Sequence, residues 1–436
     1  MTRLIPIVGQ PIVQQIVDGA ILGFDSVILS SPTDTSFKVE MSGSITNAGP
    51  MDAQISFPSP LTIAWEGRVL GTVHMATIDS KADVGAQFNV PGDFSVTDQD
   101  AMGEFAAYMI NNPDFQWNIY TDAVNVNALG LTFTNVKMNK FVTLAGANGF
   151  KDAVKINKFD LPSNDPAGGI TLTASTTINN PSQVGFNLAG AGFSAYFEDV
   201  LLGPLASDGA AVFPPKGTAN INMKGRMIPQ DSQKGLDAVT KVFENYLGGK
   251  DTPLTVVGDS GSGPNGQVGW LTKGFKSIKI ENVIMPGPDA IPSLITSIEL
   301  VNMQMDLTKD PYAPPTSSNR VQAQLHNPFG FPLGVSQISM DTIAGLGGHN
   351  IANLVVKDES ASTSDTGLVT TQFSDIPFKV YDDAHDYFDT FVTMLTSTSN
   401  VTFELSGKSD AVASTAIGSL SLDGITFGVD TTLAGM

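Results

Sequence analysis

A serine lies within a glycine-rich segment at residues 258–263, Gly-Asp-Ser-Gly-Ser-Gly, which superficially resembles the nucleophile loop of a serine protease. Such a nucleophile needs a histidine base and a carboxylate that orients the histidine. The chain has four histidines, none of them in a matching local signature: His74, His326, His349 and His385. Because turn-forming residues continue through 264–266, we interpret the segment as a flexible turn.

The densest cluster of metal-ligand residue types lies at residues 382–389, where four aspartates accompany His385. On a helix, His385 and Asp389 would share a face, as a metal site requires. Acidic residues also suit the first turn of a helix because they complement its dipole. Since no second histidine or remote ligand set accompanies the cluster, we interpret it as an acidic helix start and predict no metal site.

Two further loops match binding motifs only in part. In residues 79–85, Lys81 occupies a position that a calcium ligand would need, and no acidic residue closes a twelve-residue loop. Residues 345–349 are glycine-rich but neither follow a parallel strand nor open a helix, so a hairpin turn is predicted there instead of a phosphate cradle. The sequence therefore predicts no catalytic, cofactor-binding or metal-binding residue, and we expect the chain not to be an enzyme.

Three tryptophans, Trp65, Trp117 and Trp270, could line a ligand site. Aromatic anchors inside β-sandwiches are the commoner use of such residues. Trp65 alternates with Leu61 and Ile63, which predicts that all three point into the core of the first domain.

The composition favours a folded protein rich in strands. Of the 436 residues, 42% are hydrophobic and only 15% charged, and Thr, Ser, Asn, Gly and Val outnumber the residues typical of exposed helices. The net charge of −20 would repel phosphate backbones, so nucleic acid is not an expected partner. Without cysteine, disulfides and thiol nucleophiles are excluded.

A long repeat organises the chain. Asn47, Asn180 and Asn327 stand at equivalent Asn-Pro-like corners, at separations typical of domains and far above the roughly 20–50 residues of solenoid repeats. A strand with alternating apolar residues precedes each corner, at 37–41, 170–174 and 321–325. One amphipathic helix is predicted in each repeat, at residues 98–111, 232–247 and 382–395.

These patterns predict an all-β fold of three tandem sandwich domains, each with one short helix. The expected boundaries are a short helical segment at 1–24 and sandwich domains at 25–150, 151–305 and 306–436. In the first segment, apolar residues at helical spacing follow Pro11 and predict an amphipathic helix that packs on the first domain. The prolines and glycine that interrupt it argue against a signal peptide.

No run of 18 apolar residues occurs, so no transmembrane span is predicted. Asn400 begins the one glycosylation sequon, Asn-Val-Thr, and is the candidate modification site.

Together these segments resemble a fungal family of unknown function whose members carry tandem type-2 late embryogenesis abundant (water-stress) domains on the lumenal or outer side of membranes, especially the vacuole. The resemblance rests on 47–53 (NAGPMDA), 65–71 (WEGRVLG), 94–98 (FSVTD), 179–182 (NNPS), 201–203 (LLG) and 270–274 (WLTKG). It implies immunoglobulin-like sandwiches, no known catalysis, and a proposed ability to hold lipid or to stabilise partners. It also implies a place in the secretory pathway, in the vacuolar lumen or outside the cell.

Two functions remain open at this point. The first is a non-enzymatic structural or interaction protein whose stacked domains contact protein partners or copies of the same chain, with self-assembly into a polymer as one form. The alternative is a binder of lipid or another apolar ligand, with a cavity between the sheets under the helical lid, at a membrane surface. The polar outer faces of the alternating strands favour the first.

Overall fold

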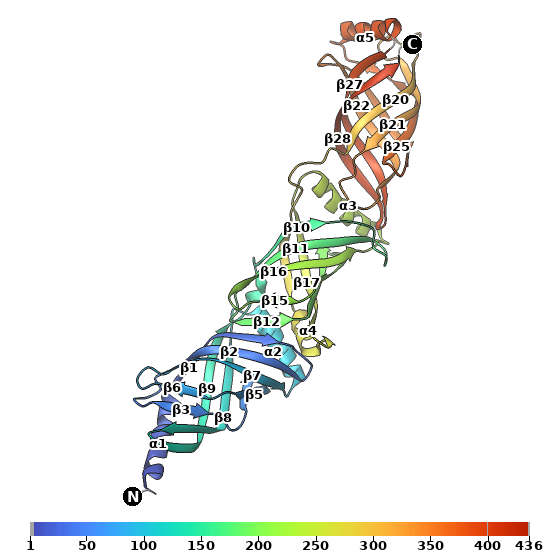
Figure 1. Ribbon diagram of the computed structural model, residues 1–436. Helices are drawn as coiled ribbons and strands as arrows, with labels where there is room; N and C mark the ends of the chain where they lie inside the picture. Colours follow the sequence, from blue (N-terminus) through green and yellow to red (C-terminus); the bar gives the residue numbers. More distant parts are fainter. Residues whose placement is uncertain (1–3, 399, 435–436) are drawn as a thin grey trace.

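The computed structural model describes residues 4–398 and 400–434. Its strands form four sheets in an elongated molecule, and the two ends of the chain lie at opposite ends of it (Figure 1). The mainly β character predicted from the sequence is confirmed. The molecule has three units.

The first unit contains α1 (Leu4–Gly19), α2 (Gln99–Asn111) and the strands β1 (Ile21–Ser30), β2 (Ser36–Thr46), β3 (Ala53–Ser56), β4 (Leu61–Trp65), β5 (Arg68–Met75), β6 (Ile78–Ser80), β7 (Ala86–Val96), β8 (Asp114–Ala128) and β9 (Leu131–Ala145).

The middle unit, entered through a short 3-10 turn (Asn148–Phe150), contains α3 (Gln233–Leu247), α4 (Gly269–Phe275) and the strands β10 (Val154–Asp160), β11 (Ile170–Asn180), β12 (Val184–Leu188), β13 (Gly190–Phe197), β14 (Val200–Ser207), β15 (Ala211–Phe213), β16 (Gly217–Met227), β17 (Thr252–Gly263), β18 (Gly266–Gln267) and β19 (Lys279–Met285).

The third unit contains α5 (His385–Ser397) and the strands β20 (Ile295–Met305), β21 (Pro315–Leu325), β22 (Gly334–Leu346), β23 (His349–Ser360), β24 (Ser362–Thr363), β25 (Leu368–Pro377), β26 (Lys379–Val380), β27 (Asn400–Thr415) and β28 (Gly418–Ala434).

The first sheet runs in the order β15-β12-β1-β2-β7-β5-β4-β8-β3-β6, with β9 also paired to β8. Two of its strands, β12 and β15, come from the middle unit. The link is a parallel ladder in which Val27 of β1 faces Val184 of β12. The sheet therefore crosses the boundary predicted at residue 150.

The middle sheet curls on itself in the order β10-β11-β16-β14-β13-β17, with β19 paired to β17. Its two outer strands, β10 and β19, lie in contact, so the strands surround a common interior. Within the described chain, β10 pairs only with β11 and β19 only with β17, which leaves a seam between them.

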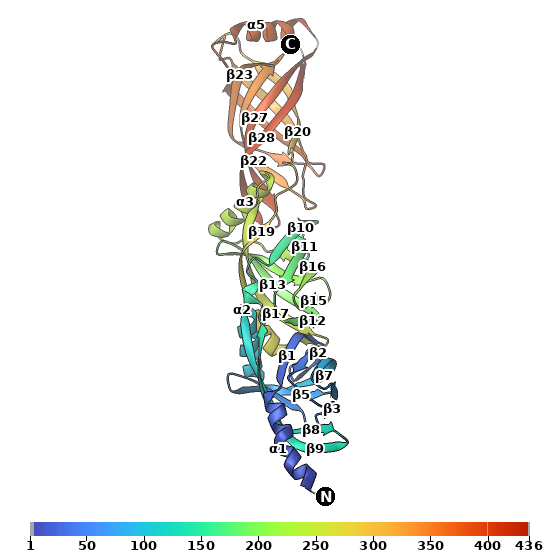
Figure 2. The ribbon, with the colours of Figure 1, turned by 90° about the vertical axis from the view of Figure 1, so that its left-hand side faces the viewer.

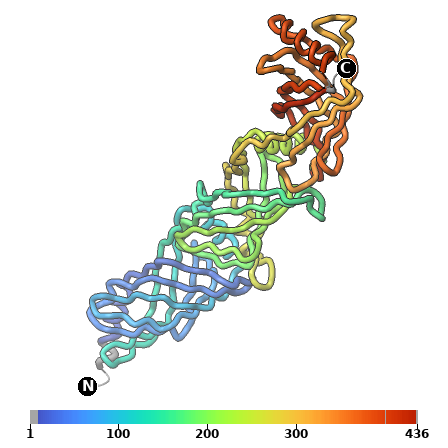
Figure 3. Tube along the Cα trace, turned by 45° about the horizontal axis from the view of Figure 1, so that its top comes forward, coloured from blue at the N-terminus to red at the C-terminus, as the bar shows by residue number. Residues whose placement is uncertain are grey.

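The third unit has two sheets, β20-β21-β25-β24 and β26-β23-β22-β27-β28, which enclose one apolar core. Strand β20 pairs with β21 along its length. The strand that precedes the predicted boundary at residue 305 thus belongs to the third unit's sheets. Sandwich layering is clearest in this unit, whereas the first two units each use one strongly curved sheet (Figure 3).

Local sequence explains the main elements. In β2, Phe37, Val39 and Met41 are buried and the residues between them exposed, as strand alternation requires. Helix α2 begins where Asp98 accepts a hydrogen bond from the amide of Ala101 (2.9 Å), and α3 begins where Ser232 caps Gly235 (3.1 Å). Helix α5 begins at residue 385 instead of the predicted 382, and its N-cap, Ala384, has no capping side chain.

Two further helices differ from the predictions. Helix α1 starts before Pro11 instead of at it, and the helix lies so close to β9 that a Cβ on Gly9 would come within 2.7 Å of the Phe133 ring. An internal proline removes one backbone hydrogen bond from the helix. Packing of α1 on β9 offsets the stability that this loss costs. Helix α4 was not predicted, because Gly269, Trp270 and Thr272 are weak helix formers and Val268 cannot cap.

The second and third corners share one hydrogen-bond pattern. The side-chain amide of Asn180 donates to the carbonyl of Val184, and that of Asn327 donates to the carbonyl of Phe331, in each case four residues on. Each asparagine oxygen also accepts from the amide two residues on. At the first corner, Asn47 instead donates to a carbonyl of α1, so the repeat is closer between the second and third copies.

No helix within residues 4–398 and 400–434 is long and apolar enough to cross a membrane.

Candidate functional site

An apolar cavity of about 100 Å³ lies inside the curled sheet of the middle unit. Seven strands surround it, and each contributes inward-facing side chains. The main lining residues are Val154, Ile156, Leu172, Ala174, Phe193, Ala195, Leu202, Leu205, Met223, Leu254, Val256, Ile280, Val283 and Met285. The strand alternation that builds the sheet therefore also builds an apolar interior.

Helix α3 closes the end of the cavity that faces the third unit, and Figure 2 shows the helix at that junction. Val242, Phe243 and Tyr246 of the helix line the cavity. Phe329, from the third corner, packs on this lid, with ring centroids 5.2 Å from Phe243 and 5.5 Å from Tyr246. A residue of the third unit thus holds helix α3, the lid, in place over the cavity.

Aromatic residues also flank the seam at β10. The ring of Phe159 meets that of Tyr246 edge to face at 5.2 Å. Phe159 and Ile156 of β10 are half-buried, so the apolar lining continues to the outside of the sheet on this side. No ladder of hydrogen bonds between the described strands closes the seam between β10 and β19.

The electrostatics of the cavity are those of a neutral site. Burial raises the pKa of the Tyr246 hydroxyl, and the carboxylates of Asp160 and Asp289 raise it further. This hydroxyl therefore stays neutral at physiological pH. Arg226 also borders the cavity, but its guanidinium donates to the carbonyls of Ala167 (2.7 Å) and Gly168 (2.6 Å). The arrangement can accommodate an apolar group and offers no pair of groups for acid-base work.

Smaller apolar cavities continue the same interior toward the first unit. One of about 40 Å³ shares Val154, Ile178 and Phe193 with the main cavity. Another of about 40 Å³ lies inside the first unit next to Trp117 and Trp270. The apolar interior thus extends along the long axis of the first two units.

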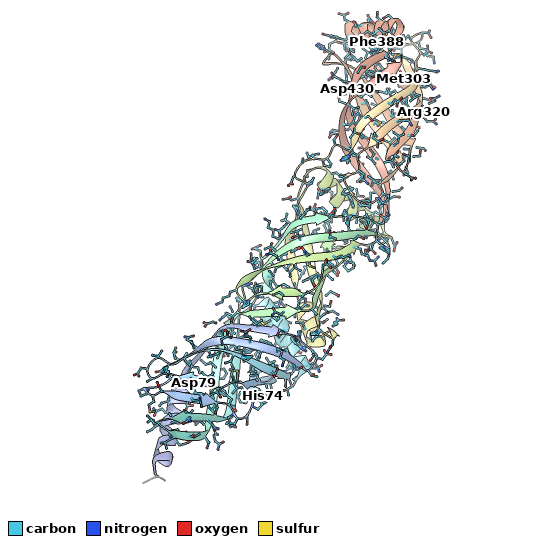
Figure 4. The ribbon with its side chains drawn as sticks, in the orientation of Figure 1. His74, Asp79, Met303, Arg320, Phe388 and Asp430 are labelled. Carbon is cyan, nitrogen blue, oxygen red and sulfur yellow. The ribbon has the colours of Figure 1, made fainter. Side chains whose placement is uncertain are left out.

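The structure places the serine loop in the middle unit, which contains none of the four histidines. Ser260 lies within β17, opposite Gly192 of β13. His74 lies in the first unit, opposite Asp93, and Figure 4 shows it far along the molecule from the third unit, where the other histidines lie. Residues 258–263 form the end of β17, so the interpretation of this segment as a flexible turn is wrong; the turn to β18 lies at residues 264 and 265.

The acidic cluster at residues 382–389 lies at the start of α5. His385 stacks on Tyr312, with ring centroids 3.6 Å apart, at the first turn of α5. Within the described chain, no group of three histidine, aspartate or glutamate side chains is placed to hold a metal ion.

The other two loops are turns. Lys81 pairs with Asp52 (3.2 Å), whose carboxylate also accepts from the amide of Ala82 (2.9 Å), so Asp52 holds the 79–85 loop. The glycines at 347 and 348 form a two-residue turn between Leu346 and His349, which confirms the predicted hairpin.

All three tryptophans are buried, as predicted. Trp270 lies on α4 of the middle unit but packs into the first unit, and its indole N–H donates to the carbonyl of Thr33 (2.9 Å). Asn400 is exposed at the start of β27, and its glycosylation stays a prediction. A cavity under a helical lid was the alternative left open by the sequence, which did not assign it to the middle unit. The sequence pattern that could have revealed the cavity is the presence of small inward-facing residues, such as Ala174 and Ala195, beside large inward-facing residues on neighbouring strands.

Residues 68–194 match the model of a family described as a protein of unknown function (DUF3712). The match covers less than a third of the chain and crosses the junction between the first and middle units. It does not bear on type-2 late embryogenesis abundant domains or on a fungal source, which stay predictions.

No protein with a curated description matches the chain. Among solved structures, a hypothetical protein from Parabacteroides merdae is 6% identical over 95% of this chain and 97% of that one, with a TM-score of 0.11. A likeness at that level carries no argument about fold or function.

Proposed function

We propose that this protein is a non-enzymatic binder of lipid or a similar apolar ligand, and that the middle unit holds the ligand's hydrocarbon part. The observation that carries the proposal is the apolar cavity of about 100 Å³ enclosed by seven strands and α3. Left empty, a cavity of that volume would cost about 2 kcal/mol of stability. A hydrocarbon group that fills it would recover that cost, whereas water would find few polar partners.

The proposal keeps the type-2 late embryogenesis abundant resemblance, with immunoglobulin-like units, as its evolutionary setting. It also keeps the predicted location in a secretory or vacuolar lumen or outside the cell. The seam between β10 and β19 supports it, because a chain could enter there without breaking a strand ladder.

A cavity-filling substitution tests the proposal. Ala174→Leu adds three carbons to the cavity lining on β11, and Ala206→Leu adds the same group to the exposed face of β14 as a control. We expect the fluorescent fatty acid cis-parinaric acid to bind the unaltered protein and the control equally, and to bind Ala174→Leu at least tenfold more weakly. Thermal unfolding verifies that both variants fold. Equal binding by all three proteins, or by none, would refute the proposal.

A structural role is a second candidate, favoured by the junctions between units. The shared β1–β12 ladder joins the first two units, and a common apolar cluster that includes Phe243, Phe331 and Leu420 joins the middle and third units. Such junctions would suit a stiff spacer that contacts protein partners, or copies of itself, at its ends. Electron microscopy of single particles would test this role, since the spacer requires a straight rod and a flexible string of units would contradict it.

A further inference from the structure

A second pocket lies at the far end of the third unit, beside the first turn of α5. Its volume is about 340 Å³, and His349, Asn350, Tyr381, Asp383, Ala384 and Tyr387 line it. Figure 4 shows Phe388 of the same helix turn at this tip of the molecule. The pocket is separate from the apolar cavity, which lies under α3 at the opposite end of the third unit.

Ring stacking fixes the walls of this tip pocket. His349, which ends the turn between β22 and β23, stacks on Tyr387 with ring centroids 4.1 Å apart and planes at 20°. Tyr312 and His385 form a second stack at 3.6 Å on the same helix turn. The two stacks hold the first turn of α5 in place from both sides. The pocket therefore has its shape before a ligand binds.

Hydrogen-bonding groups of both kinds converge in the tip pocket. The carboxylate of Asp383 accepts, the side-chain amide of Asn350 donates and accepts, and the phenols of Tyr381 and Tyr387 do both. Ala384 is the N-cap of α5 and has no side chain that could satisfy the first amides of the helix. Burial, with a smaller effect of Asp341, raises the pKa of Tyr381, so this hydroxyl remains a donor at neutral pH.

These groups discriminate between ligand charges. Asp382, Asp383 and Asp386 repel an anion at the helix start. Among the described residues, no group of three histidine, aspartate or glutamate side chains is placed to hold a metal ion. A neutral molecule with several hydroxyl groups satisfies both donors and acceptors.

The exposed ring of Tyr387 adds an apolar surface to these hydrogen-bonding groups. Tyr387 is 39% exposed although His349 covers part of its ring. An exposed phenol ring beside a carboxylate and an amide can pack against the C–H face of a pyranose while the polar groups bind its hydroxyls. We propose that the tip pocket binds a single neutral sugar residue, free or at the end of a glycan.

Saturation-transfer NMR on the full chain tests this site. The probes are the methyl glycosides of mannose, glucose, galactose and N-acetylglucosamine. We expect at least one of them to bind, and Asp383→Asn and Tyr387→Ala to weaken that binding about tenfold or more, the effect of losing a charged acceptor or the ring. Asp365→Asn, at an exposed turn elsewhere in the third unit, serves as the matched control and should bind normally.

Further measurements keep the outcome interpretable. Tyr387→Phe keeps the ring, so it should bind better than Tyr387→Ala if stacking contributes, and thermal unfolding shows whether each variant folds. Ala174→Leu should leave glycoside binding unchanged because its cavity is separate. The proposal is overturned if no glycoside binds, if only phosphate or tetramethylammonium binds, or if Asp383→Asn and Tyr387→Ala bind as the unaltered protein does.

Discussion

At the scale of single residues, buried aromatic rings carry much of the packing of the first unit. Trp65 lies with its ring centroid 5.8 Å from Phe105 and 5.1 Å from Tyr108, both on α2. These two contacts pack helix α2 against β4. Trp117 extends the same cluster, since its ring lies 5.9 Å from Phe105. The tryptophans therefore act in the core, as their alternation with apolar residues indicates.

Replacing Trp65 by alanine should cost roughly 3–5 kcal/mol of unfolding free energy, because the change leaves a large cavity beside α2. The matched control is Phe141→Ala, which removes a ring that is 63% exposed in the same unit and should change stability by less than about 0.5 kcal/mol. Urea unfolding followed by circular dichroism measures both. A Trp65→Ala variant as stable as the control would show that the ring does not hold the core.

At the scale of elements, the junction between the first two units depends on close backbone contact. Gly263, at the end of β17, lies so near the first unit that a Cβ there would come within 1.7 Å of the carbonyl oxygen of Pro32. Nearby, the amide of Gly269 donates to Asp34 (2.7 Å) and Lys273 of α4 pairs with Glu104 of α2 (3.3 Å). A surface ion pair contributes little to stability. The close backbone contact and Trp270 therefore contribute most of the stability of the junction.

Gly263→Ala should therefore destabilise the protein by roughly 1–3 kcal/mol, because the backbone atom it meets cannot rotate away. Gly428→Ala is the matched control, since this strand glycine has open space around its Cβ position and should be neutral or slightly stabilising. Differential scanning calorimetry, with hydrogen exchange at β1 and β12, measures the effect. Unchanged protection of these two strands in Gly263→Ala would contradict a tight junction.

The sequence predicts elements better than it predicts their association. Alternation and capping residues such as Asp98 and Ser232 locate strands and helices, because these signals are local. The pairing of β1 with β12 joins residues more than 150 positions apart and leaves no local signal. The middle cavity depends on how seven strands curl together, so the pattern of each strand shows its inward face but not the space between them.

At the scale of the whole molecule, the protein is a row of three units with close junctions between neighbours. A shared sheet joins the first two units, and the lid of the middle cavity is also part of the junction with the third. Occupancy of the cavity would therefore stabilise the centre of the molecule and the packing of α3 at the same time.

The central claim is that the middle unit holds an apolar ligand, and native mass spectrometry of the full chain, purified without detergent, tests it most directly. We predict a population heavier than the bare chain by the mass of one lipid, lost on organic extraction and absent from Ala174→Leu but present in Ala206→Leu. A single species at the mass of the bare chain, before and after incubation with fatty acid or phospholipid, would contradict the account.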